Sequence, residues 1–165
     1  MTFTTSVDEI VRKKTIGVFL IFTVIPLFNL FRSSDKWIWY LCFFIFFMLI
    51  LLYTYLHRPV QYQVDNDKVV INRPVGNIEI SIHDILRVDR IHHDLLKNSS
   101  KGGAFGYFGN FNTDFGKIRF YATRRDKLVM LTKKDNTKLI LTPDQEDEFI
   151  KDVETKASSQ QVHLQ

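Results

Sequence analysis

A run of twenty residues, Trp37–Leu56, constrains this chain more than any other stretch of its sequence. It contains no charged residue, no glycine and no proline. As an α-helix it would be about 30 Å long, which is the thickness of the hydrocarbon core of a bilayer. The sequence therefore predicts a membrane-spanning helix. Aromatic residues of the kind that settle at membrane–water interfaces stand at its two ends as expected anchors: Trp37, Trp39, Tyr40, Tyr53 and Tyr55.

A second apolar run precedes the first. Thr15–Phe31 has seventeen residues and no charge, which is at the short end for a span, and Pro26 and Asn29 stand in its last turns. Because proline leaves a helical hydrogen bond unmade, we expect a kink there. A cleaved signal peptide is the alternative, but no small-residue cleavage site follows, and residues 32–36 lead straight into the next apolar run. The sequence therefore favours a transmembrane two-helix hairpin over residues 15–56.

Lysine and arginine are unevenly distributed around this hairpin. Six flank its outer ends and two lie in its connecting loop, namely Arg12, Lys13, Lys14, Arg58, Lys68 and Arg73 against Arg32 and Lys36. Positive charge is enriched on the cytoplasmic side of membrane helices. We therefore expect a protein of the cell (inner) membrane with two spans and both termini in the cytoplasm, residues 1–14 forming a cytoplasmic N-terminal segment.

Charge and cysteine content exclude several classes of protein. The net charge of +4 divides evenly, with +2 from residues 1–56 and +2 from residues 57–165. Neither part is basic enough to indicate nucleic-acid binding. Cys42 is the only cysteine and lies inside the apolar run, so neither a disulfide framework nor a cysteine-based metal site is expected.

No pattern of catalytic residues is found either. The chain has no nucleophile motif, no paired carboxylates with a clear role and no zinc signature. His92, His93 and Asp94 are adjacent, and neighbouring side chains on a strand point to opposite faces, which makes them poor joint ligands. We therefore predict no catalytic residue, metal, cofactor or small-molecule substrate, and we do not expect an enzyme.

The chain after residue 57 shows the alternation of apolar and polar residues that is typical of β-strands. Ile78, Ile80 and Ile82 alternate with polar residues, and turn residues such as Asn66-Asp67 separate the runs. The pattern predicts seven antiparallel strands: 61–65, 68–72, 78–82, 85–91, 118–123, 128–132 and 137–141.

A C-terminal helix is predicted to follow the strands. Thr142 stands where an N-cap is expected, Pro143 suits the first helical position, and Gln145 stands three residues on, as in a capping box. We expect this helix to cap a partly open barrel, so that residues 57–156 form one mainly-β domain. The last residues, 157–165, lack periodicity and are expected to be a flexible tail.

Three segments of this domain resemble a known family. They are the run Gly102–Gly109, the run Tyr121–Arg125, and Leu141–Asp144 before an acidic helix. Together they resemble the bacterial pleckstrin-homology-like (PH-like) family over roughly residues 60–154. The resemblance implies the PH-like fold, and members often carry this domain after two membrane spans. It implies no particular activity.

Two segments are candidates for binding. In the glycine-rich loop Lys97–Gly116, aromatic side chains either enter the membrane interface or bind a partner, or they fold back to close the barrel. In the basic turn after residue 123, cations either contact anionic headgroups or are merely solvated. The candidate loop residues are Phe105, Gly106, Tyr107, Phe108, Gly109 and Phe111, and the candidate headgroup contacts are Arg124, Arg125 and Lys127.

The expected function is therefore non-enzymatic. A PH-like module tethered to the lipid bilayer would dock a protein partner or a second copy of itself at the cytoplasmic face, since tethering raises local concentration. The alternative is a sensor of anionic lipid headgroups or of membrane-active compounds, acting through the basic turn and the aromatic loop.

Overall fold

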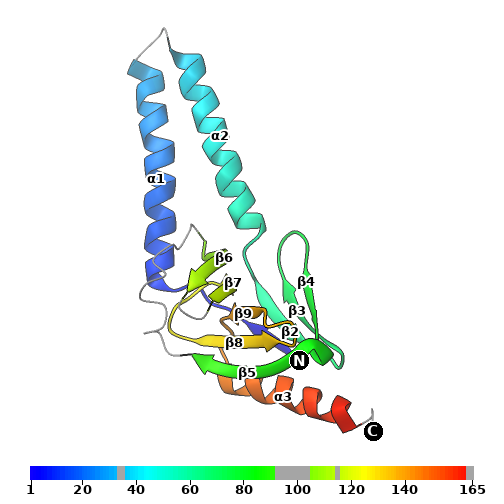
Figure 1. The fold of residues 1–165 in the computed structure, drawn as a ribbon. Helices are drawn as coiled ribbons and strands as arrows, with labels where there is room; N and C mark the ends of the chain where they lie inside the picture. The colour runs from blue at the N-terminus through cyan, green and yellow to red at the C-terminus, as the bar shows by residue number, and fades with distance from the viewer. Residues whose placement is uncertain (33–35, 92–104, 114–115, 163–165) are drawn as a thin grey trace.

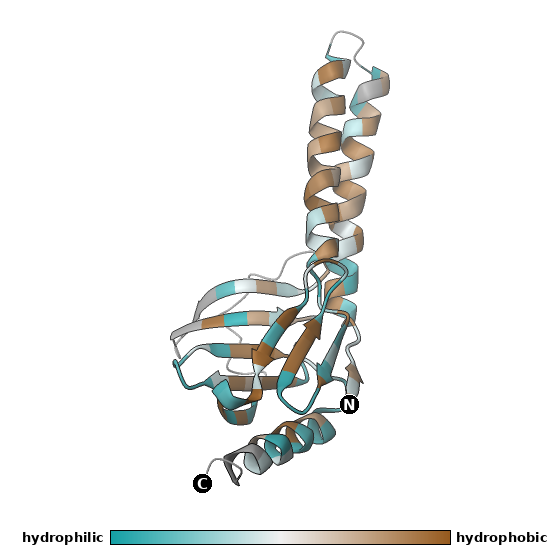
Figure 2. Cartoon of the chain, turned by 90° about the vertical axis from the view of Figure 1, so that its right-hand side faces the viewer, coloured by the Kyte–Doolittle hydropathy of each residue, from teal (hydrophilic) through white to brown (hydrophobic). Residues whose placement is uncertain are grey.

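A helical hairpin stands on a β domain in the computed structural model, which describes residues 1–32, 36–91, 105–113 and 116–162 (Figure 1). The hairpin consists of α1 (Glu9–Arg32) and α2 (Trp37–Leu56). The two helices pack against each other, and the ring of Phe22 stacks on that of Phe47 with centroids 3.8 Å apart. Hydrophobic residues follow both helices along their length (Figure 2).

Of these two helices, α2 has the composition of a span. Within the described residues, Trp37–Leu56 is the one helix long and apolar enough to cross a membrane, with a mean hydropathy of 2.2. The other helix begins at Glu9, six residues before the predicted span. This earlier start is stabilised by Asp8, whose Oδ1 accepts a hydrogen bond from the backbone N–H of Val11 at 2.6 Å and so caps the first turn of α1.

The β domain contains nine strands in two sheets among the described residues. The first sheet has the order β1-β2-β3-β4, and the second has the order β5-β8-β9-β7-β6. The short 3-10 helix η1 (Ile82–Asp84) links β4 to β5. The strands are β1 (Thr2–Thr4), β2 (Gln61–Val64), β3 (Lys68–Asn72), β4 (Ile78–Ser81), β5 (Ile85–Ile91), β6 (Tyr107–Thr113), β7 (Gly116–Ala122), β8 (Leu128–Lys133) and β9 (Lys138–Leu141).

This arrangement corrects the predicted barrel in three ways. The strands β1 and β6 were not expected, because one has only three residues and the other lies in a stretch read as a loop. Strands β7 and β9 are parallel rather than antiparallel, since β9 returns between β8 and β7. The two sheets do not close on each other. The strand predicted over residues 85–91 is confirmed with the same bounds.

The hairpin is an insertion between two neighbouring strands of one sheet. Strand β1 precedes it, β2 follows it, and the two pair antiparallel with Phe3 opposite Tyr62. Phe3 is only 2% exposed, and its ring meets Phe149 edge to face at 5.3 Å. The first residues of the chain are therefore part of the β domain, although the strand pattern became recognisable only after the hairpin.

Two hydrophobic cores hold the molecule together. The first lies between the sheets and the C-terminal helix and includes Tyr62, Leu131 and Phe149. The second includes Phe120 and Leu128 and also receives Val11 from α1, which is 0% exposed. Because α1 contributes a core residue, its first turns are fixed to the β domain.

The C-terminal helix, α3 (Glu146–Val162), differs from its prediction at both ends. Thr142 does not cap it, because its Oγ1 instead accepts a hydrogen bond from Thr123 N–H at 3.0 Å inside the domain. The helix begins at Glu146, three residues after the predicted first position Pro143. It continues through Ala157, which packs on the first core, so the stretch expected to be a tail is helical up to Val162. Residues 163–165 lie outside the described part.

Candidate functional site

Phe105, the first of the candidate loop residues, lies where the hairpin meets the β domain. Its backbone N–H donates to Thr15 Oγ1 of α1 at 2.9 Å, and its ring meets Tyr55 of α2 edge to face at 5.5 Å. One residue thus contacts both helices of the hairpin.

Tyr107, two residues after Phe105, is buried and belongs to the second core. The Arg125 guanidinium carbon lies 4.7 Å from the centre of its ring, a cation–π distance. Burial raises the pKa of Tyr107, and the nearby Arg125 charge opposes that rise. Phe108 is half-buried, Gly109 is exposed, and the side chain of Phe111 is outside the described part. The structure thus uses Phe105 and Tyr107 within the fold.

The candidate headgroup contacts Arg124 and Lys127 are engaged in internal contacts. Arg124 Nη1 lies 2.8 Å from Asp144 Oδ1 and 2.7 Å from Ser6 Oγ, and the same guanidinium also pairs with Asp126. Lys127 Nζ donates to the backbone carbonyl of Asp144 at 2.6 Å. The basic turn therefore ties the segment after β1 to the start of α3.

We expect Asp126 and Asp144, the two carboxylates that pair with Arg124, to make the stability of the domain depend on pH. Burial opposes ionisation of Asp144, but hydrogen bonds from Ser6 and Arg124 outweigh it and lower its pKa, and the Arg124 hydrogen bond lowers the pKa of Asp126. A carboxyl whose pKa is lowered on folding stabilises the fold above its unfolded pKa of about 3.9, and this contribution is lost as the pH falls through the folded value.

The melting temperature of the full chain in detergent, measured from pH 6 to pH 3, should drop most steeply below about pH 4. The Asp144→Asn variant should start lower and show a shallower drop; an unchanged slope would contradict this account.

The predicted interface anchors lie at opposite ends of α2. Trp37 and Trp39 are exposed in its first turn, beside the loop of the hairpin, whereas Tyr53 and Tyr55 are in its last turn beside the β domain. Arg58 places its guanidinium 4.4 Å from the centre of the Tyr55 ring. Tyr55 therefore joins Phe105 and Arg58 at the base of the hairpin.

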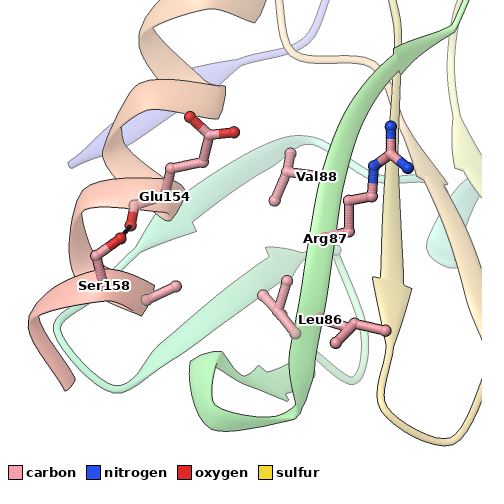
Figure 3. A pocket seen from close by; sticks show the side chains of 7 residues that line it. Leu86, Arg87, Val88, Glu154 and Ser158 are labelled. Atoms are coloured by element: carbon pink, nitrogen blue, oxygen red, sulfur yellow. Dashed lines mark hydrogen bonds between the residues drawn. The ribbon is translucent and has the colours of Figure 1, made fainter. Parts of the chain in front are cut away.

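A groove that the sequence did not reveal lies at the other end of the molecule. It separates β5 from α3 and has a volume of about 350 Å³ (Figure 3). Strand β5 is an edge strand of the second sheet. In this sheet β6 lies beside the hairpin, and β5, at the opposite edge, lies farthest from the hairpin (Figure 1). The lining residues are Ile85, Leu86, Arg87, Val88, Glu154, Ala157 and Ser158.

The walls of this β5–α3 groove combine apolar and charged side chains. Val88 and Ala157 pack on the first core and give the groove an apolar floor, while Leu86 is 64% exposed at its rim. Arg90 binds Glu146, at 3.6 Å, and Asp147 in the first turn of α3. These ion pairs hold the helix against one end of the strand and keep the two walls in place.

Neither a metal centre nor a catalytic constellation accompanies this groove in the described part of the chain. No group of three or more histidine, cysteine, aspartate or glutamate residues gathers there in a metal-binding arrangement. The His92-His93-Asp94 run lies outside the described residues. The groove presents backbone groups of an edge strand, apolar contacts and single charges.

Comparison with known protein families gives a match. A family model described as a bacterial PH domain matches residues 60–157. No curated protein and no solved structure matches the chain. The matched segment contains β2 to β9 and most of α3, and it leaves out β1. Since the match covers more than half of the sequence, the chain belongs to the bacterial PH domain family.

Proposed function

We propose that this protein is a membrane-tethered, non-enzymatic module that docks a soluble protein at the cytoplasmic face of the cell membrane. PH domains are generally binding modules without catalytic activity. In this proposal both hairpin helices span the bilayer, and the β domain and both termini are cytoplasmic. The packing of α1 along α2 and the excess of Lys and Arg at the outer ends of the hairpin support it.

The single observation that carries the docking role is the β5–α3 groove. It joins an apolar floor, an exposed leucine and an edge strand, which are features of protein-binding surfaces. Its two walls, β5 and α3, lie at the end of the domain opposite the hairpin (Figure 1). A protein in the aqueous phase would reach it without contacting the bilayer.

Binding of anionic lipid headgroups is a second candidate, and one observation favours it. Arg12, Lys13 and Lys14 are exposed in the first turns of α1, where the hairpin leaves the β domain. Each cation near an anionic surface contributes about 1 kcal/mol. Because Arg124 and Lys127 are bound internally, such contacts would come from α1 rather than from the basic turn.

The docking role is tested by photo-crosslinking in cells. A crosslinking amino acid at Leu86, and separately at Glu154, should trap the same soluble cytoplasmic protein. Glu148, exposed on α3 but outside the groove lining, is the matched control and should give at least tenfold less of that product.

Each other outcome would overturn one part of the proposal. Equal trapping from position 148, or none from positions 86 and 154, would show that the groove does not dock a protein. Trapping of an extracytoplasmic protein would reverse the proposed orientation, and trapping of a second copy alone would replace the soluble partner by self-assembly.

A further inference from the structure

We propose that the groove takes an extended segment of the partner, which pairs with β5 as an added strand and places a lysine or arginine against Glu154. This inference rests on the proposed docking function and names the mode of binding and the chemistry of the ligand. It follows from the free edge of β5, from the charges of α3, and from the direction in which the edge points.

The edge of β5 is the first observation. This strand has seven residues, Ile85–Ile91, and among the described strands it pairs on one side only, with β8. Every second residue of such a strand directs its N–H and C=O away from its neighbour. The edge strands of the first sheet are shorter, with three residues in β1 and four in β4. The long edge of β5 therefore offers a row of backbone donors and acceptors beside the groove.

The charges of α3 give the second observation. The helix contains five acidic and two basic residues. Several of these are paired: Arg90 binds Glu146 and Asp147, and Lys156 binds Asp152. Glu154 lines the groove, and its carboxylate has no cationic partner among the described residues; Figure 3 shows it facing β5. A segment lying beside β5 would bring its own side chains opposite this carboxylate, and a basic one would complement it.

The apolar floor defines the other side chains of the segment. Side chains two residues apart along a strand point to the same face of a sheet, so the residues two positions before and after the basic one would also face α3. Val88 and Ala157 offer them an apolar surface, and Leu86 adds one at the rim. A segment with β-branched residues two positions before and after a basic residue fits this surface.

The direction of the edge excludes pairing of β5 with the β5 of a second copy in the same membrane. Two β5 edges can pair only if each points toward the other. The edge of β5 points away from the hairpin, since the order of the second sheet runs from β6 beside the hairpin to β5 (Figure 1). The hairpin of a paired copy would then point in the opposite direction, away from the bilayer that holds the first. The segment must therefore come from the aqueous phase.

The test uses the full chain in nanodiscs of zwitterionic phosphatidylcholine, which do not attract basic peptides by charge. The probes are an eight-residue peptide in which lysine and valine take turns at the odd positions and threonine fills the even positions, and its counterpart with glutamate in place of lysine. We expect the lysine peptide to bind at least tenfold more tightly and to slow hydrogen exchange at amides of β5. Methylation of alternate backbone nitrogens of the peptide should weaken binding at least tenfold, because it removes the donors of the added strand.

The variant Glu154→Gln provides the charge control, and Glu148→Gln is its matched partner outside the groove. The first should reduce the preference for lysine over glutamate to threefold or less, and the second should leave it unchanged. If neither peptide slows exchange in β5, or if the methylated peptide binds equally well, strand addition is wrong. Crosslinking from Leu86 to a soluble protein would in that case still support docking, so the two proposals fail separately.

Discussion

Replacing Gly106 with alanine is expected to destabilise the β domain severely. A Cβ atom there would lie 2.6 Å from the Phe108 ring and 2.7 Å from the backbone oxygen of Ala122, and the residue has a φ of +148°. The ring can rotate away, but the oxygen belongs to the paired strand β7 and cannot. Overpacking and backbone strain each cost about 1–3 kcal/mol, so we expect a loss of about 3 kcal/mol and a melting temperature about 10 °C lower or more.

Gly109→Ala is the matched control for this prediction. Gly109 lies three residues later, in β6, with a φ of +108°, but an added Cβ there would meet no atom of the described residues within 4 Å. This variant should bear the backbone strain alone, about 1 kcal/mol. Thermal melting of both variants in detergent, followed by the circular dichroism of the sheets, compares them. Equal losses would show that contact with Ala122 is not what requires glycine at position 106.

Replacing Phe3 with alanine should have the largest effect outside the matched family segment. Phe3 is 2% exposed in the first core, and removing a buried phenylalanine side chain costs about 3–5 kcal/mol. The loss should appear as a lower melting temperature of the β-sheet signal of the full chain. It would arise although residue 3 stands before the hairpin and the affected sheet lies mostly after it.

Val7→Ala serves as the control in the same segment, because Val7 is 41% exposed. Its substitution should change stability by about 0.5 kcal/mol or less. Phe3→Leu should recover most of the loss, since leucine fills much of the same volume. A melting temperature unchanged by Phe3→Ala would mean that β1 does not contribute to the stability of the domain.

The insertion of the hairpin between β1 and β2 has a mechanical consequence. The chain enters α1 from a paired strand and leaves α2 for another, with residues 57–60 as the second connection. Val11 of α1 is in the second core, and Phe105 contacts both helices. The β domain is therefore attached to the hairpin at both ends and by side chains between them. This attachment holds the β5–α3 groove at the end opposite the hairpin.

Part of this structure could be read from local patterns. The uncharged run Trp37–Leu56 forms α2 with the predicted bounds, and the β-rich runs 68–72 and 85–91 were predicted as β3 and β5 to the residue. The resemblance to PH-like domains is confirmed by the family match. These features were visible because helix length, strand alternation and turn residues are properties of neighbours in the chain.

The remaining features depend on contacts between distant residues. Thr2–Thr4 is a strand only because β2, almost sixty residues later, supplies its hydrogen bonds. The guanidinium of Arg124 is bound within the fold because folding places Ser6 and Asp144, from two other segments, beside it. The groove exists because α3 returns beside β5, so that Val88 and Ala157 share one floor. The sequence by itself determined most of the elements and their family. Tertiary packing decided that β1 and β6 are strands, which strands pair, which charges are satisfied and where a ligand can bind, because each of these depends on surfaces that meet only when the chain folds.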